Sequence, residues 1–121
     1  MRLTLLKSKL HRLVVTGAEL HYEGSFTLDE ELMEIASLVP HERIEIYNVT
    51  NGSRLATYVI PGEGGSRTAQ ANGAAAHLIN EGDIVILASY AEVEADEAAL
   101  HRPVVVQVAE GNEPRAPTHV A

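Results

Sequence analysis

The sequence predicts a single, mainly β domain: a small barrel with a few short helices. Short apolar or alternating runs, which are typical of strands, recur along most of the chain. Asn51-Gly52 lies between two of these runs and is a strong hairpin-turn signal, because both residues tolerate a positive φ. A length of 121 residues suits one compact domain, which we expect to cover residues 1–121.

Five segments are predicted as strands. Residues 10–16 form an apolar run rich in β-branched side chains. Residues 43–49 alternate between apolar and polar side chains, and residues 54–60 resume the alternation, so we expect a hairpin from Ile44 to Ile60. Residues 83–90 and 103–108 are continuously apolar, which favours strands buried on both faces or closed into a barrel.

One helix is well marked. Thr27 and Glu30 have the spacing of a capping box, in which each side chain satisfies a free backbone donor. Four apolar side chains then fall on one helical face, and Pro40 ends the helix. These four are Leu32, Ile35, Ala36 and Val39. Weaker helical patterns cover residues 73–79 and 92–100, and residues 111–121 are expected to be loosely held.

Composition excludes several kinds of site. The formal net charge is −8, which disfavours binding to nucleic acid or to an anionic membrane. The absence of cysteine rules out disulfides, thiolate metal sites and cysteine nucleophiles. No apolar run approaches the roughly 20 residues that span a bilayer, and the N-terminal residues do not form a signal peptide, so we expect a cytoplasmic protein.

Other chemistry-bearing patterns are weak. The six histidines show no pair at metal-binding spacing, so no metal site is expected. The glycine-rich segment 62–67 lacks the Gly-Lys-Ser/Thr ending of a phosphate-binding loop. No Gly-x-Ser-x-Gly elbow supports a Ser-His-Asp triad.

The dipeptide Gly24-Ser25 has two interpretations. By composition it is a turn before a helix. By chemistry, the Ser25 hydroxyl can attack the Gly24 carbonyl carbon if the backbone is held strained, which gives an N-to-O acyl shift to an ester. Glycine favours this attack because it has no side chain and tolerates unusual φ and ψ. The shift also needs a donor aimed at the developing oxyanion.

Five stretches together resemble the bacterial pyruvoyl-dependent aspartate 1-decarboxylases, over roughly residues 1–108. Tyr22-Glu23-Gly24-Ser25 resembles the self-processing site of that family. The other four are Lys9-Leu10-His11-Arg12, Asn48-Val49-Thr50-Asn51-Gly52, Arg54-Leu55-Ala56-Thr57-Tyr58 and Asn72-Gly73-Ala74-Ala75-Ala76-His77. Departures from the family pattern occur at Phe26, Gly64-Gly65 and Gln70.

The resemblance implies a six-stranded double-ψ β-barrel that assembles as a homotetramer, with active sites between subunits. It implies self-cleavage between Gly24 and Ser25, with Thr57 steadying the oxyanion. The products would be chains 1–24 and 25–121, with a covalent pyruvoyl group derived from Ser25 and no metal or pyridoxal phosphate. A maturation factor is a further implied partner. The activity implied is that of a carboxy-lyase, which decarboxylates L-aspartate to β-alanine and CO₂ and supplies pantothenate for coenzyme A.

The reaction itself explains the need for a ketone. Loss of CO₂ leaves a carbanion on the α-carbon, and a Schiff base between the substrate amine and the ketone delocalises it. By resemblance, Tyr58 is the proton donor to that carbon. Substrate carboxylates would be held by Arg54, whose planar fork matches carboxylate geometry, and by Lys9 as a point charge.

The remaining residues implied by resemblance surround the substrate. Asn72, Gly73, Ala74 and Ala75 form a loop that offers backbone donors, while His11 and Tyr22 line the pocket. Thr57 and Tyr58 are neighbours on a predicted strand, so their side chains should point to opposite faces. Two rival interpretations stay open: a β-barrel binding module without catalysis, and a family member that keeps Ser25 unreacted.

Overall fold

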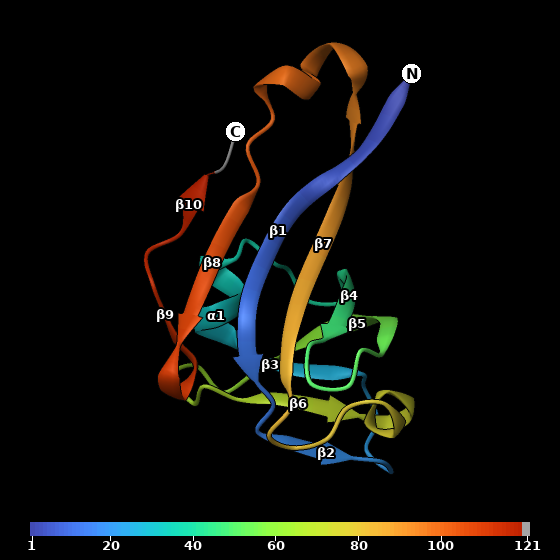
Figure 1. Ribbon diagram of the computed structural model, residues 1–121, viewed down its shortest axis with the longest axis vertical. Helices are drawn as coiled ribbons and strands as arrows, with labels where there is room; N and C mark the ends of the chain where they lie inside the picture. The colour runs from blue at the N-terminus through green and yellow to red at the C-terminus, as the bar shows by residue number, and fades with distance from the viewer. Residues whose placement is uncertain (120–121) are drawn as a thin grey trace.

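The computed structural model describes residues 1–119 of the chain. Among these residues, strands predominate and only one short α-helix forms (Figure 1). The elements are β1 (Arg2–Val14), β2 (Gly17–Glu19), β3 (Phe26–Asp29), α1 (Glu30–Ile35), β4 (Arg43–Asn48), β5 (Arg54–Gly62), β6 (Ala69–Asn72), the 3-10 helix η1 (Gly73–His77), β7 (Ile84–Glu94), η2 (Ala95–Leu100), β8 (Val104–Ala109), η3 (Glu110–Asn112), β9 (Glu113–Pro114) and β10 (Thr118–His119).

The strands follow one hydrogen-bonded path, β10-β8-β1-β7-β4-β5-β3-β6-β2, with β9 attached to β8. Three neighbouring pairs are parallel: β1 with β8, β3 with β5, and β2 with β6. Figure 1 shows β1, β7 and β8 running along the long axis while β3, β6 and β2 cross beneath them. Within residues 1–119 the path stays open between β10 and β2, so the architecture is a mainly β domain whose sheet does not close.

The predicted hairpin is confirmed. β4 and β5 pair antiparallel from Arg43 opposite Tyr58 to Tyr47 opposite Arg54, around the turn at Asn51-Gly52. The other strand predictions are confirmed with changed ends. β1 begins much earlier than the predicted residue 10, and β7 extends beyond residue 90, because the two strands pair along an arm that rises above the body.

The core lies between the long strands and the crossing ones. Ile44 and Ile46 face it from β4 and are fully buried, as the alternation predicted. Phe26, the only phenylalanine in the chain, is also fully buried in β3. With so few aromatic residues, the rest of the core is built from Leu, Val, Ile and Ala side chains together with Met33.

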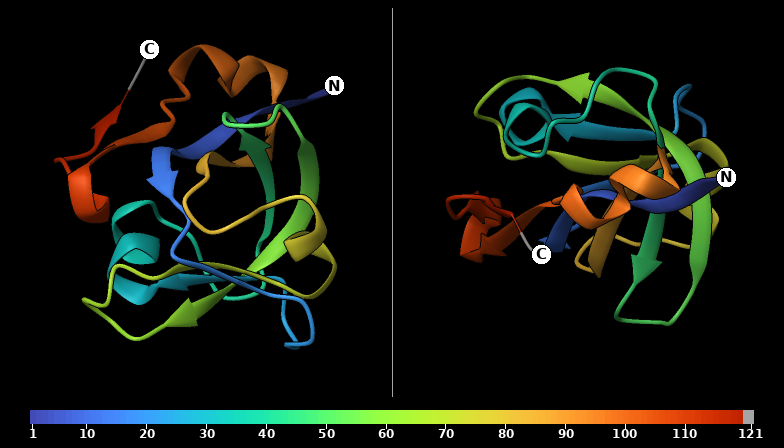
Figure 2. Two further views of the ribbon diagram at one scale, coloured as in Figure 1. Left: turned by 60° about the horizontal axis from the view of Figure 1, so that its bottom comes forward. Right: turned by 90° about the horizontal axis from the view of Figure 1, so that it is seen from above.

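The capping-box prediction was wrong. Thr27 lies inside β3, because Phe26 and Leu28 are buried on either side of it in a strand that pairs with both β5 and β6. The helix begins after Asp29, whose carboxylate accepts a hydrogen bond from the Glu31 amide. It ends at Ile35, so Val39 is 59% exposed rather than part of a buried face. Figure 2 shows this short helix beside β3 and β5.

Asp29 joins three segments. Its Oδ1 accepts hydrogen bonds from the amides of Glu31 (2.8 Å) and Gly65 (2.9 Å), and its Oδ2 accepts from the amide (2.7 Å) and the guanidinium (3.1 Å) of Arg67. Burial alone would raise the pKa of Asp29, but the donors of Arg67, Gly65 and Glu31 outweigh it and hold that pKa below its ordinary value. The buried side chain is therefore a carboxylate that fixes the start of α1 to the loop after β5.

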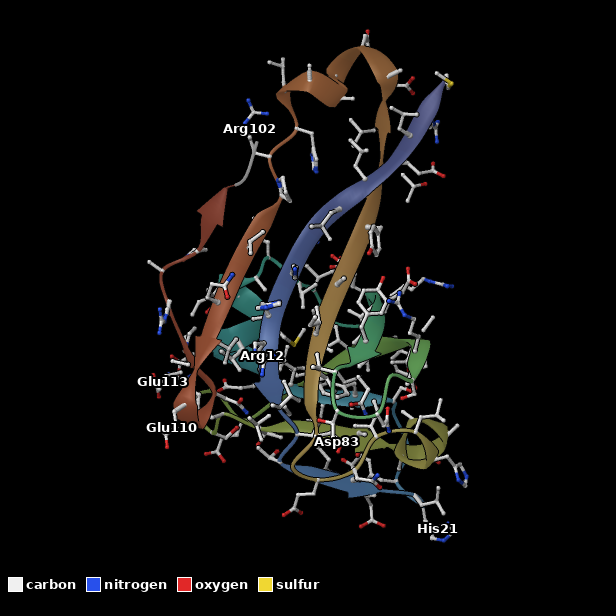
Figure 3. The ribbon with its side chains drawn as sticks, in the orientation of Figure 1. Arg12, His21, Asp83, Arg102, Glu110 and Glu113 are labelled. Carbon is white, nitrogen blue, oxygen red and sulfur yellow. The ribbon has the colours of Figure 1, made fainter. Side chains whose placement is uncertain are left out.

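The weak helical patterns become 3-10 turns, and the first part of the second belongs to β7. The prediction of a loosely held tail was wrong for residues 111–119, since β9 and β10 both pair with β8. Glu110 and Glu113 mark the turn that follows β8 (Figure 3). Asn112 belongs to this turn and is 2% exposed. Its Oδ1 accepts from the Val14 amide (2.8 Å), and its Nδ2 donates to the Val14 carbonyl (2.9 Å), as a paired strand would. Residues 120–121 lie outside the described residues.

Candidate active site

The Gly24-Ser25 peptide lies in the connection between β2 and β3. Gly24 has a φ of +88°, in the region that side chains rarely adopt. A Cβ built on Gly24 would lie 2.8 Å from the Cδ1 atom of Ile60, closer than real Cβ contacts allow. The carbonyl of Ser25 accepts a hydrogen bond from the Asn72 amide at 2.9 Å. Both the backbone conformation and the neighbouring side chain therefore favour glycine before Ser25.

Ser25 borders a pocket of about 220 Å³. One wall is the beginning of β5, with Thr57, and the other is η1 and the residue after it. The full lining is Ser25, Leu55, Ala56, Thr57, Ala74, Ala75 and Leu78. The fold thus brings together four of the residues singled out by sequence: Ser25, Thr57, Ala74 and Ala75.

Asn72 and Gly73 connect β6 to η1 beside this pocket. The Asn72 side chain is fully buried, donates to Thr27 Oγ1 (2.8 Å) and accepts from Gln70 Nε2 (2.8 Å). Gly73 has a φ of +60°, and a Cβ there would lie 3.3 Å from the Tyr22 carbonyl oxygen. The chain before the Gly24-Ser25 peptide therefore runs close against the start of η1, while the Tyr22 side chain is 53% exposed.

Tyr58 faces away from Thr57, as strand geometry requires. Thr57 pairs with the buried Ile44, whereas Tyr58 pairs with the exposed Arg43. Tyr58 is 41% exposed, and its ring centroid lies 6.4 Å from that of His41. The proposed oxyanion donor and the proposed proton donor thus lie on opposite faces of β5.

The residues expected to hold the substrate lie on the Tyr58 face. His11, Ile86, Tyr47 and Arg54 pair in one row across β1, β7, β4 and β5. Directly paired residues project to the same face, and Lys9 lies two positions from His11 on β1. Lys9, His11 and Arg54 therefore share one outer sheet face, and none of them lines the Ser25 pocket.

Arg54 is held against an aromatic ring on that face. Its guanidinium carbon lies 4.7 Å from the centroid of Tyr47, within cation–π range. The Tyr47 and Tyr90 hydroxyl oxygens are 2.7 Å apart. This hydrogen bond, followed by burial, raises the pKa of Tyr47 to about 12. The ring beneath Arg54 thus stays a neutral phenol at any physiological pH.

The surroundings of His11 disfavour its protonated form. Burial, with the positive charges of Lys9 and then Arg12, lowers the pKa of His11 below its ordinary value. Its Nδ1 atom is buried and has no hydrogen-bond partner within residues 1–119. Leaving a buried ring nitrogen without a partner costs free energy, so His11 Nδ1 is available to form a hydrogen bond with a further group at this face.

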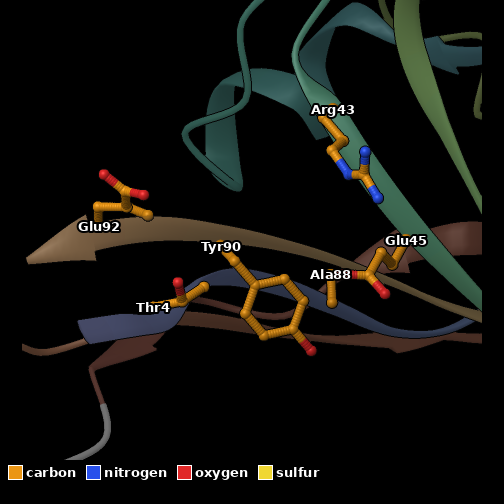
Figure 4. A pocket seen from close by; sticks show the side chains of 7 residues that line it. Thr4, Arg43, Glu45, Ala88, Tyr90 and Glu92 are labelled. Atoms are coloured by element: carbon orange, nitrogen blue, oxygen red, sulfur yellow. The ribbon is translucent and has the colours of Figure 1, made fainter. Parts of the chain in front are cut away.

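A second pocket, of about 240 Å³, lies on the same outer face (Figure 4). Arg43 and Glu45 from β4 border it together with Tyr90 from β7 and Thr4 from β1. None of the residues singled out by sequence lines it. Its Glu45 and Ala88 nevertheless pair with each other, and Ala88 pairs with Lys9, so it adjoins the Lys9–Arg54 face.

Metal and membrane sites have no support in the described part of the chain. Within residues 1–119, no three His, Cys, Asp or Glu side chains gather so that they could hold a metal ion. The same residues contain no helix of the length and apolar character needed to cross a membrane.

Comparison with known proteins assigns the family. The profile of the aspartate decarboxylase family matches residues 1–115. The chain belongs to this family. A relative from Salinibacter ruber named aspartate 1-decarboxylase is 55% identical over 113 residues, covering 93% of this chain and 77% of the relative. A relative of the same name from Maricaulis maris is 52% identical over 112 residues, covering 93% of each chain.

Some site residues of this aspartate decarboxylase family member were missed from the sequence. Leu55 and Ala56 line the Ser25 pocket and stand next to Thr57 on a predicted strand, so the strand pattern could have found them. Tyr47 faces Arg54 across the hairpin, and the register set by the turn could have found it. Leu78 follows η1 and carries no signal that distinguishes it from any surface leucine.

Proposed function

We propose that this chain is an aspartate 1-decarboxylase, a carboxy-lyase that converts L-aspartate into β-alanine and CO₂ and so supplies pantothenate for coenzyme A. The observation that carries the proposal is the Gly24-Ser25 peptide in a member of this family. Gly24 has a backbone conformation that favours glycine, and Ser25 borders a pocket with Thr57. The interpretation of Gly24-Ser25 as a simple turn gives no reason for Ser25 to border a pocket, and neither does the binding-module interpretation.

In the proposed maturation, the Ser25 hydroxyl oxygen attacks the Gly24 carbonyl carbon, and the Gly24–Ser25 amide becomes an ester. Thr57 donates a hydrogen bond that steadies the oxyanion during this shift. β-Elimination then removes the Cα proton of residue 25 and breaks its Cβ–O bond, which releases chain 1–24 as a carboxylate and leaves a dehydroalanine at position 25. Water converts that residue into a pyruvoyl group and expels ammonia. A maturation factor acts, in this proposal, by helping the chain to reach the attack geometry.

The residues around Ser25 fit such a group. Small side chains at Ala74 and Ala75 leave room beside position 25, and the Asn72 amide already binds the Ser25 carbonyl. Once formed, the ketone supplies the electron sink that decarboxylation needs, without metal or pyridoxal phosphate. The chain's own residues bind and protonate: Arg54 and Lys9 hold the carboxylates, and Tyr58 delivers a proton to the α-carbon.

We further propose that the complete site forms between two copies of the chain in a homotetramer. The support is geometric: Ser25 and Thr57 border one pocket, whereas Lys9, Arg54 and Tyr58 lie on the outer sheet face. A neighbouring copy that presents this face to the Ser25 pocket would bring both groups together. His11, with its free ring nitrogen, and Tyr22 then line the same substrate site.

The proposed architecture is a six-stranded double-ψ β-barrel over one domain, residues 1–121, in the cytoplasm. Its support is the set of parallel pairs that join distant strands, β1 with β8, β2 with β6, and β3 with β5. Parallel pairs need crossover connections, so these pairs link segments that are far apart in the sequence.

The first test is the intact mass of the purified protein under denaturing conditions. We expect two species, residues 1–24 and residues 25–121, the larger lighter by one ammonia than a chain that starts with serine. Ser25→Ala is the matched control and should stay whole and folded. A wild-type chain that stays whole after incubation with cell extract, and that does not react with hydroxylamine, contradicts the proposal and leaves a binding barrel or an unprocessed family member.

The role of Tyr58 has its own test. Tyr58→Phe keeps the ring and removes the hydroxyl proton. The chain should still be cleaved, but its rate of β-alanine formation should be about 100-fold or more below that of the wild type. The measurement is β-alanine formation per mole of processed chain. Near-normal turnover in this variant would remove Tyr58 from the role of proton donor.

Mixed assemblies test the intersubunit site. Ser25→Ala and Arg54→Ala chains should each be inactive alone, yet active when co-expressed, because some interfaces then combine Ser25 of one copy with Arg54 of another. Co-expressed chains that remain inactive, although mass spectrometry of the native assembly shows mixing, would place both residues in the site of a single chain.

A further inference from the structure

The turn between β4 and β5 points three donors at one carbonyl in the wall of the Ser25 pocket. Asn48 Nδ2 (3.2 Å), Asn51 Nδ2 (3.0 Å) and Ser53 Oγ (3.1 Å) all donate to the Leu78 carbonyl oxygen. A carbonyl oxygen has two lone pairs, so three donors saturate it. We call this group of three donors and the Leu78 carbonyl the Leu78 clamp.

The hydrogen bonds inside the turn do not use these donors. Its own geometry is maintained by the acceptor atoms of the same side chains: Asn48 Oδ1 accepts from the amides of Thr50 (3.0 Å) and Asn51 (3.3 Å). Asn51 Oδ1 accepts from the Ser53 amide at 2.8 Å. Two backbone bonds, Gly52 amide to Asn48 carbonyl (2.8 Å) and Asn48 amide to Ser53 carbonyl (2.9 Å), complete the turn. The donor atoms are thus free to bind elsewhere, and they converge on Leu78.

The clamp connects the two walls of the pocket. Ser53 immediately precedes β5, whose Leu55 and Thr57 form one wall, and Leu78 immediately follows η1, whose Ala74 and Ala75 form the other. The Leu78 amide donates in turn to the Ala75 carbonyl at 3.1 Å. At the opposite end of η1, the Asn72 amide binds the Ser25 carbonyl at 2.9 Å. The helix that faces Ser25 is therefore fixed at both ends.

We propose that Asn51 and Ser53 are positioning residues for the reaction at Gly24-Ser25. They act through Leu78, by setting the distance between η1 and the β5 wall that carries Thr57. The inference rests on the proposed function, because it assigns these residues to the self-cleavage step. Asn48 is left out of the test because it also binds the carboxylate of Asp83 at 2.8 Å, and its replacement would disturb the core.

The experiment compares variants that remove one donor each. Ser53→Ala removes the hydroxyl but keeps the amide that the turn uses. Asn51→Asp keeps the Oδ1 acceptor and puts a carboxylate oxygen, which repels the Leu78 carbonyl oxygen, in place of the Nδ2 donor. Ser53→Thr keeps a hydroxyl at this position. Thr50→Val is the matched control, because the Thr50 hydroxyl accepts from the Ile84 amide (2.9 Å) in the same turn and does not contact Leu78.

Each full chain is synthesised in a cell-extract translation system, and cleavage is followed over time by intact mass. Loss of one hydrogen bond that is needed for the reaction geometry corresponds to a rate about two- to tenfold lower. We expect this decrease in Ser53→Ala and Asn51→Asp, and a rate near wild type in Ser53→Thr and Thr50→Val. Hydrogen exchange should show faster exchange of residues 73–78 in the first two variants, but not in Thr50→Val.

The outcomes separate the two hypotheses. If the wild-type chain stays whole, the proposed function fails, and the inference fails with it. If the wild type is cleaved while Ser53→Ala and Asn51→Asp are cleaved as fast as Thr50→Val, only the inference is overturned. A fall in melting temperature shared equally by all four variants, with unchanged cleavage, would give these residues a structural role alone.

Discussion

The backbone at Gly24 allows a quantitative test of the strain around the proposed cleavage site. Gly24→Ala adds a Cβ to a residue with a φ of +88° and places it 2.8 Å from Ile60 Cδ1. The left-handed conformation costs a non-glycine residue about 1–2 kcal/mol. Moving the Ile60 tip out of its rotamer costs about 1 kcal/mol more. The less flexible unfolded chain offsets about 0.5 kcal/mol, so the variant should be about 2 kcal/mol less stable.

The two contributions can be separated with a second substitution. Ile60→Val removes Cδ1, the atom that the new Cβ would meet, so it should relieve the contact but not the φ strain. In the double variant we therefore expect a favourable coupling of about 1 kcal/mol relative to the sum of the single variants. Four chains complete the cycle, all in a Ser25→Ala background so that cleavage does not mix with unfolding.

Urea unfolding at one fixed protein concentration measures the four free energies, with the m-value as a check that the unfolded state is unchanged. Additive single effects would show that Ile60 does not restrict this position. A Gly24→Ala chain as stable as its parent would refute the claim that the conformation favours glycine.

Three further predictions concern other parts of the molecule. Asp29→Asn should cost about 2 kcal/mol at neutral pH, because four donors face its carboxylate. Since the pKa of Asp29 is lowered by folding, its contribution is complete above the unfolded value of 3.8 and disappears as the pH falls through the folded value. The difference between the two chains in urea unfolding should therefore stay constant from pH 7 to about pH 4 and narrow as the pH falls further, and a difference that grows on acidification would contradict the assignment. Asn112→Gly keeps the positive φ but removes three hydrogen bonds to Val14 and Arg67, so urea unfolding should show a loss of about 2 kcal/mol, and equal stability would refute the role of this side chain. Tyr90→Phe should lower the pKa of Tyr47 from about 12, as measured by ultraviolet titration, and an unchanged value would show that their hydrogen bond is not its cause.

Local signals predicted the parts of the fold that depend on neighbours in sequence. The β4–β5 hairpin follows from the alternation through Ile44 and Ile46 and from Asn51-Gly52, all within one short segment. The prediction of the helix start was wrong. Thr27 and Glu30 have the spacing of a capping box, but pairing with distant strands places Thr27 in β3. Pairing with β5 and β6 buries Phe26 and Leu28, and this burial outweighs a cap whose loss costs only about 1 kcal/mol.

The parts of the site that depend on neighbours in sequence were predictable as well. Alternation along β5 correctly separates Thr57 from Tyr58, because a strand's side chains project alternately whatever its partners are. The approach of Ala74 and Ala75 to Ser25 came only from the family resemblance, since it depends on contacts between segments far apart in sequence. The Leu78 clamp was not predicted, because a main-chain carbonyl has no sequence signature.

The position of β1 in the sheet has a consequence for the mature protein. β1 pairs with β7 along almost its whole length and with β8 on its other side, so it is an internal strand. After the proposed cleavage this strand belongs to chain 1–24, which no covalent bond connects to the rest. Unfolding would then release a separate peptide, and refolding would become a bimolecular association whose yield falls on dilution. The precursor would therefore fold as a single chain. The mature protein, once unfolded and its two chains separated, would not readily refold.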